Sequence, residues 1–397
     1  MSEWKKYRLG DLVITNRKSI DKDFPYTNIL YLDTGSITTN AITELQKFEL
    51  NKAPSRAKRI VCDEDIIYST VRPNQLHYGF IQNPQNNLIV STGFATITCK
   101  KDKIHPKFLY YHLSQTQITE YLHIIAESST STYPSIKPSD IEALEIFAPS
   151  LPTQTQIAQI LTSFDDKIEL LGQMNQTLET IAQTIFKEWF VDFNFPGFDG
   201  ELINGLPKGW RMGKLGEEFD LVMGQSPKGE TYNEDGNGMV FYQGRTDFGF
   251  RFPTNRLFTT EPNRKANTLD TLVSVRAPVG DINMANEPCC IGRGLSSVRH
   301  KTKAFSYTYY LMKSIENILK GFESEGTVFG SINKSNFEDI EILVPELKSV
   351  QEFEITVNAI DYKILENANQ IRTLTQLRDT LLPKLMSGAV AMKNKTL

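Results

Sequence analysis

The residue types that most often bind metals or act as nucleophiles are few and scattered in this sequence. Five histidines stand at positions 77, 105, 112, 123 and 300, and four cysteines at positions 62, 99, 289 and 290. They form no CxxC pair, HExxH motif or other metal-ligand spacing, so we expect neither a zinc site nor a disulfide framework. The histidines at 112 and 123 are expected on helix surfaces.

An acidic triplet is the nearest approach to a magnesium site. Asp63, Glu64 and Asp65 could in principle hold magnesium for a nuclease. The triplet directly precedes the apolar run IIYST, where a solvated turn is the simpler interpretation. An isolated nucleophile outside any motif stays open, but no constellation of residues indicates one. We therefore predict no metal site and no catalytic residues.

Motifs of nucleotide-hydrolysing and methyl-transferring enzymes are missing as well. The sequence has no glycine-rich phosphate loop followed by Lys and Ser or Thr, and no GxGxxG after a strand. The nearest string to the Asn/Asp-Pro-Pro-aromatic tetrapeptide of amino-methyltransferases, Asn194-Phe195-Pro196-Gly197, lacks the second proline and the aromatic residue. We predict that this chain does not hydrolyse nucleotides by itself, and the usual signal for a dinucleotide or S-adenosylmethionine pocket is missing, so no cofactor is expected in this chain.

The basic side chains are grouped in two windows. The net charge of the whole chain is −4, which by itself argues against a nucleic-acid partner. Residues 46–107 and residues 243–303, however, each hold ten Lys or Arg against five Asp or Glu, whereas residues 151–200 hold two against seven. Ordinary variation in surface charge explains one such window more easily than two. The pattern favours two separate nucleic-acid contacts.

Each window offers candidate side chains for a nucleic-acid contact. The first window contains a cluster of four cations: Lys52, Arg56, Lys58 and Arg59. Their side chains either contact phosphate oxygens or are simply solvated. Four further residues follow the end of a predicted strand: Arg72, Asn74, Gln75 and His77. They either contact the edges of guanine and adenine bases or form a structural loop. The second window offers arginines, which can bind guanine through two hydrogen bonds: Arg245, Arg251, Arg256, Arg276, Arg293 and Arg299.

The elements that carry these residues occur twice. The first strand motif, WKKYRLG at 4–10, recurs as WRMGKLG at 210–216, and the apolar run IIYSTVRP (66–73) returns as LVSVRAPVG (272–280), which places Arg72 over Arg276. STGFATI (91–97) corresponds to GRGLSSV (292–298), and LYYHL (109–113) to TYYLM (308–312). PSIKPSDIEALEIFAP (134–149) matches GSINKSNFEDIEILVP (330–345) without a gap, at an offset of 196. The chain is predicted to contain one unit in two copies.

Each copy ends in a heptad pattern. Apolar residues alternate at spacings of four and three after residue 156 and again after residue 352, which is typical of the a and d positions of a coiled coil. The predicted seam includes Leu161, Ile168, Asn175, Leu178 and Trp189 in the first copy and Phe353, Ile364, Asn367, Leu374 and Leu381 in the second. An amphipathic helix lying on its own domain is the alternative.

The two helices are expected to pair with each other in antiparallel orientation. A parallel pair would require the connection after the first helix to run back along the whole seam, which residues 191–209 could barely do. In an antiparallel pair, alignment of Asn175 with Asn367 also brings Trp189 beside Phe353 and Leu161 beside Leu381. We predict this register, because a single alignment then pairs the seam residues of the two helices in every layer.

These motifs together resemble the DNA-specificity subunit of Type I restriction–modification systems. The resemblance rests on a strand ending in STVRP or SVRAP, on the stretch YPSIKPSDIEALEIFAPSLPTQTQIA, and on the helix ends FKEWFVDF and LRDTLLPKLMSG, and it covers essentially the whole chain. It implies α/β (α+β) target-recognition domains in two pseudo-symmetric copies, joined by two long antiparallel coiled-coil helices in a dumbbell-like molecule. The implied parts are target-recognition domains at 1–150 and 193–345 and conserved spacer helices at 151–192 and 346–391.

The resemblance also implies the partners. They would be double-stranded DNA, two modification subunits that methylate adenine with S-adenosylmethionine, and restriction subunits that translocate and cleave DNA with ATP and Mg²⁺. The chain itself would be non-catalytic and would read an asymmetric bipartite site. Two alternatives stay open: a stand-alone DNA-modifying enzyme with an unrecognised site, and a coiled-coil adaptor that binds no DNA.

Length and composition agree with such a protein. The chain has 397 residues, enough for two to four domains, and 40% of them are hydrophobic while 23% are charged. No long apolar stretch suggests a membrane span, and the N-terminus lacks the apolar segment of a signal peptide. We expect a cytoplasmic location and no membrane partner.

Overall fold

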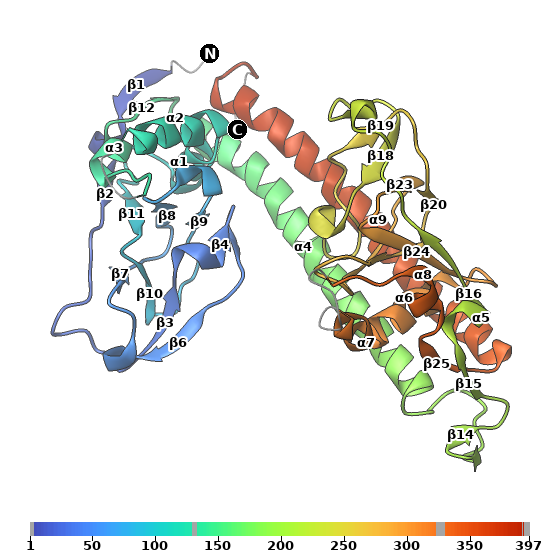
Figure 1. The fold of residues 1–397 in the computed structure, drawn as a ribbon. Helices are drawn as coiled ribbons and strands as arrows, with labels where there is room; N and C mark the ends of the chain where they lie inside the picture. Colours follow the sequence, from blue (N-terminus) through green and yellow to red (C-terminus); the bar gives the residue numbers. More distant parts are fainter. Residues whose placement is uncertain (1–3, 129–132, 323–329, 391, 393–397) are drawn as a thin grey trace. The chain divides into compact units, whose positions relative to one another are not determined.

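The chain divides into two compact units. The computed structural model describes residues 4–128, 133–322, 330–390 and 392. Unit 1 comprises Met1–Ile168 and Arg372–Leu397, and unit 2 comprises Glu169–Ile371. Each unit holds a β-rich region and a part of each of the two long helices, α4 (Leu151–Phe190) and α9 (Leu347–Met386), as Figure 1 shows. None of the helices in the described part of the chain is both long and apolar enough to cross a membrane.

Unit 1 contains two four-stranded sheets and two short strand pairs. The sheet orders are β2-β11-β8-β9 and β6-β3-β10-β7, and the pairs are β1-β12 and β4-β5. The strands are β1 (Lys5–Arg8), β2 (Val13–Thr15), β3 (Asn28–Leu32), β4 (Ile37–Thr38), β5 (Ala41–Ile42), β6 (Gln46–Glu49), β7 (Ala57–Ile60), β8 (Ile66–Ser69), β9 (Tyr78–Phe80), β10 (Leu88–Ser91), β11 (Phe94–Cys99) and β12 (Glu145–Ala148). The shorter helices are η1 (Leu9–Asp11), η2 (Thr34–Ser36), η3 (Leu50–Lys52), η4 (Pro73–Gln75), α1 (Pro106–Leu113), α2 (Thr116–Glu127) and α3 (Pro138–Glu142).

Unit 2 has a similar arrangement, in which the second sheet has five strands among the described residues. Its sheet orders are β16-β24-β21-β22 and β17-β19-β18-β23-β20, and its pairs are β15-β25 and β13-β14. The strands are β13 (Leu202–Ile203), β14 (Leu206–Pro207), β15 (Arg211–Lys214), β16 (Phe219–Met223), β17 (Tyr232–Asn233), β18 (Met239–Tyr242), β19 (Phe258–Thr259), β20 (Lys265–Ala266), β21 (Thr271–Ser274), β22 (Ile282–Met284), β23 (Cys289–Ile291), β24 (Leu295–His300) and β25 (Glu341–Val344). The shorter helices are α5 (Leu215–Glu218), η5 (Gly229–Thr231), η6 (Arg245–Asp247), α6 (Phe305–Ser314), α7 (Glu316–Gly321) and α8 (Lys334–Glu338).

Strand pairing confirms the internal repeat. In each unit one parallel pair, β3 with β10 or β18 with β23, is flanked by antiparallel neighbours. The strand that carries the IIYS or TLVS run, β8 or β21, is buried at every residue, which explains its continuous apolar sequence. The predicted α/β fold class in two copies is therefore correct.

The long helices begin and end where the sequence changes character. Helix α4 starts after Pro149, and Pro152 occupies its first turn, where a missing N–H is tolerated. Helix α9 contains Pro383 only in its last turn, and Gly388 follows with a positive φ of 74°, a conformation that favours glycine. The helices therefore end before the predicted boundaries at residues 192 and 391, and residue 391 lies outside the described residues.

Within each unit the two helices pair in the predicted register. In unit 1 the side chains of Ile157 and Leu161 share a core with Leu381 and Leu385. In unit 2 the rings of Trp189 and Phe353 lie 5.8 Å apart in an edge arrangement. The seam residues that lie between these layers are all buried or half-buried. Antiparallel pairing with one constant register thus describes the helices in both units.

A pair of amides interrupts the apolar seam of unit 2. Asn367 Nδ2 donates a hydrogen bond to Asn175 Oδ1 at 2.9 Å, and Asn175 Nδ2 donates to the Ile364 carbonyl at 3.4 Å. Asn175 is 4% exposed and Asn367 is fully buried. A single polar layer of this kind specifies register at a cost in stability, because any shift would leave the amides without partners.

Replacement of one of these amides should destabilise the protein more than replacement of both. Asn175→Leu leaves the Asn367 amide buried without its partner, which should cost about 1–3 kcal/mol. Asn175→Leu/Asn367→Leu removes both polar groups and should be at least as stable as the wild type. The urea midpoint of the helical circular dichroism signal measures this, and a double variant as unstable as the single one would contradict it.

One half-buried histidine, His112, leads us to predict a dependence of stability on pH. His112 was expected on a helix surface, but its Nε2 atom is buried without a partner among the described residues. Burial lowers the pKa of His112 to about 4. The unfolded chain therefore binds a proton more readily than the folded chain between about pH 6.5 and pH 4, so stability falls as the pH falls through this window.

The loss should amount to about 3 kcal/mol at most by pH 4. The variant His112→Leu carries the residue that corresponds to it in unit 2, Leu311, and should lose this contribution. Urea unfolding at pH 4.5 and pH 7 would measure the difference, and an unchanged pH dependence in the variant would count against the assignment.

Candidate nucleic-acid interface

In unit 1 a tight turn joins the two basic groups of the first window. The turn lies between β10 and β11. The backbone N–H of Thr70, just after β8, donates to the Gly93 carbonyl at 2.8 Å, and the N–H of Thr92 donates to the Arg56 carbonyl at 2.8 Å. Arg56 and the loop that begins at Arg72 therefore border the same turn, although they are far apart in sequence.

The loop that follows β8 has a fixed and unusual shape. Arg72 and Leu76 flank η4 with positive φ angles of 46° and 59°, which are uncommon for residues with a side chain. The Arg72 N–H donates to the Pro134 carbonyl at 3.0 Å, and its guanidinium lies 5.4 Å from the centre of the Tyr133 ring. The loop buries Pro73 and exposes Arg72, Asn74 and Gln75. Strained backbone of this kind occurs often at binding sites.

His77 is tied to its own domain through one ring nitrogen. Its Nδ1 atom lies 2.5 Å from the Ile37 carbonyl oxygen and 3.3 Å from the Thr38 hydroxyl, and the ring is half-buried. Because a carbonyl only accepts, Nδ1 carries the proton of this bond. Only Nε2 is left for a contact with DNA.

The other candidate cations of the first window, Lys52, Lys58 and Arg59, lie in η3 and β7. Lys52 is exposed and pairs with Glu49 at 2.8 Å, and Lys58 is exposed on β7. Arg59 is half-buried, and its Nη1 donates to the Ser19 hydroxyl at 3.2 Å. Lys52 and Lys58 keep the exposure that a phosphate contact needs, whereas Arg59 has a packing role.

The same turn recurs in unit 2 and gathers three arginines. The N–H of Val275 donates to the Gly294 carbonyl at 2.9 Å, and the Gly294 N–H donates to the Gln243 carbonyl at 3.2 Å. The ends of β21 and β18 and the turn before β24 therefore meet, which brings Arg276, Arg293 and Arg245 to one corner. Arg276 and Arg293 are exposed and form no ion pair with a described residue, whereas Arg245 is paired with Asp281.

These bonds correct the predicted equivalence of Arg72 and Arg276. Thr70 occupies the position of Val275. The backbone N–H of each donates to the glycine of its turn, and the carbonyl of each accepts from the N–H of an isoleucine, Ile136 in unit 1 and Ile332 in unit 2. Arg276 therefore matches Val71, and the residue that matches Arg72 is Ala277, whose N–H donates to the Gly330 carbonyl at 3.1 Å. STVRP and SVRAP therefore align without a gap, and Pro73 matches Pro278. The sequence alignment was therefore one residue out.

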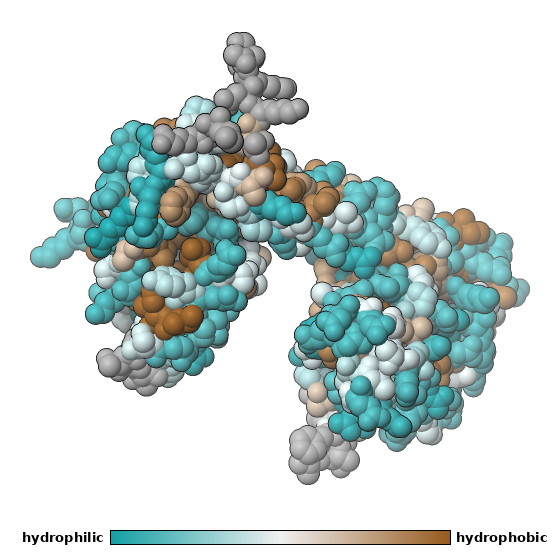
Figure 2. Space-filling view, turned by 90° about the horizontal axis from the view of Figure 1, so that it is seen from above, coloured by the Kyte–Doolittle hydropathy of each residue, from teal (hydrophilic) through white to brown (hydrophobic). Residues whose placement is uncertain are grey.

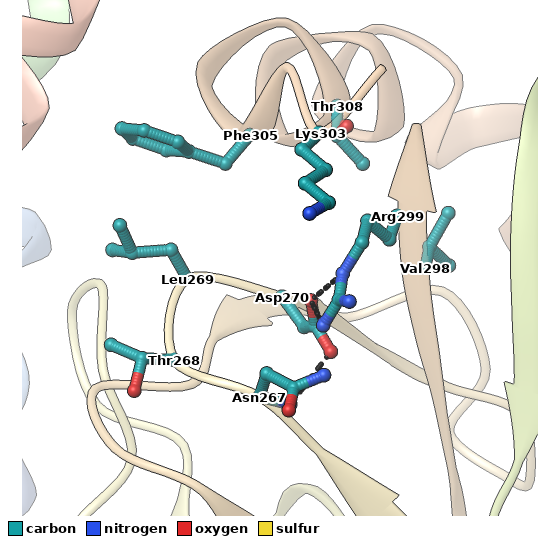
Figure 3. A pocket seen from close by; sticks show the side chains of 9 residues that line it. All are labelled: Asn267, Thr268, Leu269, Asp270, Val298, Arg299, Lys303, Phe305 and Thr308. Atoms are coloured by element: carbon teal, nitrogen blue, oxygen red, sulfur yellow. Dashed lines mark hydrogen bonds and ion pairs between the residues drawn. The ribbon is translucent and has the colours of Figure 1, made fainter. Parts of the chain in front are cut away.

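Two further arginines of the second window are neutralised by aspartates. Arg256 pairs with Asp247 at 2.8 Å. Arg299 pairs with Asp270 at 2.5 Å, at the wall of a cavity of about 240 Å³ (Figure 3). Lys303, which the sequence did not single out, points into the same cavity. Arg299 is partly exposed, but its charge is already balanced by Asp270, so it offers little to a phosphate.

Arg251 was predicted to contact DNA, and the structure contradicts this. Its side chain is 1% exposed and lies between Glu179 of α4, at 2.5 Å, and Asp361 of α9, at 2.7 Å. Tyr310 accepts a third hydrogen bond from it at 3.1 Å, and the guanidinium stacks 3.4 Å from the centre of the Tyr309 ring. The acidic residues on the helices draw this arginine inward, where DNA has no access to it.

The surface in view is mainly polar. Hydrophilic side chains cover most of the visible face of each unit, and hydrophobic ones form small patches (Figure 2). No group of three or more His, Cys, Asp or Glu within residues 4–128, 133–322 and 330–390 is arranged to hold a metal ion. The acidic triplet illustrates this, because Asp65 instead accepts hydrogen bonds from the Cys62 N–H and the Thr98 hydroxyl.

Comparison with known proteins identifies relatives over the whole chain. The family model described as Type I restriction modification DNA specificity domain matches residues 1–180 and 207–381. The chain is 28% identical to the Type I restriction enzyme HindI specificity subunit of Haemophilus influenzae, over 98% of this chain and 100% of that protein. It is 29% identical to the putative MjaX specificity subunit of Methanocaldococcus jannaschii, over 98% and 94%. The crystal structure of a Type I S subunit from M. genitalium has the same fold, with a TM-score of 0.61 at 19% identity over 97% of this chain and 96% of that one.

Proposed function

Since the chain belongs to the family of Type I restriction–modification DNA specificity domains, we propose that it is the non-catalytic DNA-specificity subunit of such a complex. Residues 1–150 and 193–345 act as two target-recognition domains that each read one half of a bipartite site. The segments 151–192 and 346–391, which contain α4 and α9, separate the two readers. The observation that carries this proposal is the repeated corner, at Gly93 and at Gly294, with exposed arginines in both copies of the fold.

The exposed residues at each corner divide naturally into two roles. Arg56, Lys52 and Lys58 suit phosphate oxygens, because they are exposed in the turn before β7, on η3 and on β7. Arg72, Asn74 and Gln75 suit base edges, because a backbone of fixed shape presents them together.

In the second domain Arg276 and Arg293 are the corresponding candidates for contacts with bases. The two domains share their framework but not these side chains, so the two half-sites should differ and the whole site should be asymmetric.

The helices would also serve as the docking surface for the catalytic subunits. Several large apolar side chains on them are exposed: Leu170, Met174 and Ile181 on α4, and Ile355, Tyr362 and Leu377 on α9. Two modification subunits with S-adenosylmethionine would methylate adenine, and restriction subunits with ATP and Mg²⁺ would translocate and cleave DNA. This chain would supply neither cofactor site.

Methylome sequencing tests the proposal directly. Cells that produce this chain with its modification subunit should carry an asymmetric bipartite methyladenine motif, and cells without this chain should lack it. Methyl transfer from labelled S-adenosylmethionine by the purified chain alone would indicate a stand-alone enzyme instead. A complex that shows no affinity for DNA even at low salt would indicate an adaptor.

Removal of the arginines at the two corners should affect the two half-sites separately. Arg72→Ala should relax specificity at the first half-site and Arg276→Ala at the second, by about 1–3 kcal/mol each if the side chain binds guanine through two hydrogen bonds. Arg256→Ala is the matched control, since its charge is balanced by Asp247. Binding to specific and random DNA by the complex would be compared, and an equal loss on both would assign the arginine to phosphates.

Lengthening of both helices should lengthen the gap between the half-sites. One heptad inserted after Ile168 and one before Arg372 adds about 10 Å to the helix pair and keeps the seam in phase. At about 3.4 Å per base pair this corresponds to roughly three base pairs. The methylated motif should keep its half-site bases and gain a longer spacer.

An insertion just before Asp192 would not do this, because Phe186, Trp189 and Phe190 already pack in the core of unit 2. Seven Gly and Ser residues inserted at the exposed turn Asn204–Gly205 provide the control and should leave the spacer unchanged. An active heptad variant with the original spacer would mean that the partner subunits set the separation.

A further inference from the structure

Arg251 links the β-rich region of unit 2 to both helices at once. Its backbone belongs to the β-rich region, because its carbonyl accepts from the Met284 N–H of β22 at 3.0 Å. The neighbouring Gly249 carbonyl accepts from Asn283 Nδ2 at 2.9 Å, and Phe248 and Pro253 form an isolated bridge. The segment that carries Arg251 is therefore fixed to the sheet on one side.

The side chain of Arg251 is fixed to the helices on the other side. One terminal nitrogen donates to Glu179 of α4 and the other to Asp361 of α9, and each of these carboxylates is at most 6% exposed. Tyr310 accepts from the arginine and donates to Asp361 Oδ1 at 2.9 Å. Burial is the main cause that raises the pKa of Tyr310, so its hydroxyl stays protonated and can donate. The arginine is the shared partner of two buried acids from two helices.

Unit 1 contains the same Tyr–Asp pair but a different source of the cation. Tyr111, which corresponds to Tyr310, donates to Asp165 at 2.6 Å, and Asp165 corresponds to Asp361. There the cation is Arg378 of α9, whose Nη1 donates to Asp165 at 2.7 Å. Charge balance in unit 1 is thus achieved by a residue of the helix pair.

At the repeat offset of 196, the position that corresponds to Arg378 is Ala182 of α4. Unit 2 therefore lacks the helix-borne cation, and an arginine from the β-rich region takes its place. In unit 2 the cation that pairs with Asp361 therefore comes from the β-rich region, which is the proposed DNA-recognition domain, and not from a helix.

We propose that Arg251 is a positioning residue that holds the second recognition domain in one orientation on the helix pair and so restricts the complex to one spacer length. This inference rests on the proposed function and adds a residue that sets spacing without touching a base. The backbone of Arg251 is anchored in the sheet, and its side chain is anchored on the two helices. Burial of the guanidinium charge requires both carboxylates. A rotated domain would therefore leave charges buried without partners.

Arg251→Met tests the link, because methionine fills much of the space and removes the charge. The half-site bases should stay the same, while the preference of the complex for the cognate spacer over spacers one base pair longer or shorter should fall at least tenfold. The methylome should show the same half-sites with additional spacer lengths. Arg256→Met, in the same segment but exposed and paired with Asp247, should leave spacer preference unchanged.

A second variant separates the connection that Arg251 makes between the β-rich region and the helices from the positive charge that it supplies to Asp361. Ala182→Arg in the Arg251→Met background returns a cation to Asp361 from the helix, as in unit 1. This double variant should recover thermal stability but not spacer preference. Recovery of both would show that the charge alone matters and would overturn the proposal, as would an unchanged spacer preference in Arg251→Met.

Thermal unfolding establishes that each variant folds. If Arg251→Met does not fold, Arg251→Lys replaces it with the same readouts, since lysine keeps the charge but cannot bridge both carboxylates in a planar fork. A wild-type complex that shows no bipartite motif would refute the proposed function itself. A wild-type motif with unchanged spacer preference in the Arg251 variants would refute only this inference.

Discussion

Buried polar groups with few possible partners determine how this chain packs. An apolar seam alone would tolerate a shift by one heptad, because leucine and isoleucine layers fit one another in more than one alignment. The hydrogen bond between Asn175 and Asn367 removes that freedom in unit 2, and the Arg251 cluster beside it adds a second set of buried groups that fit in only one way. The elements of unit 2 are thus arranged by the need to satisfy a few polar atoms, while the large apolar residues supply the stability.

The two units solve the same electrostatic problem with different residues. Asp165 and Asp361 occupy equivalent positions and accept from equivalent tyrosines, yet their cations come from Arg378 and from Arg251. In unit 1 the ion pair is about one-third exposed, and solvent screens it. In unit 2 it is fully enclosed, where loss of one partner is far more costly. The same fold therefore balances equivalent aspartates with a residue of the helix pair in unit 1 and with a residue of the β-rich region in unit 2.

Periodicity and repetition predicted the fold well, because each reports directly on burial. The heptads predicted α4 and α9 and the alignment of Trp189 with Phe353, and the repeated motifs predicted matching sheets. The candidate site was harder to predict. Charge composition placed Arg251 among DNA-binding residues because composition does not distinguish an exposed arginine from one drawn inward by Glu179 and Asp361. The one-residue error at Arg276 arose because identical letters were aligned, whereas hydrogen bonds to Gly294 define the true match. No local signal identifies Lys303, which reaches its cavity through the fold alone.

The corners at Gly93 and Gly294 are held by main-chain hydrogen bonds, from Thr70 and Thr92 in one unit and from Val275 and Gly294 in the other. Such bonds are independent of side-chain identity, so the protruding residues around them can be exchanged without loss of the scaffold. On the proposed function, natural variants would acquire new recognition sequences by point substitution at these tips, with little penalty in folding. A chain that carries two such tips can diversify each of them independently, so that the number of attainable sequence combinations is the product of the choices at the two tips.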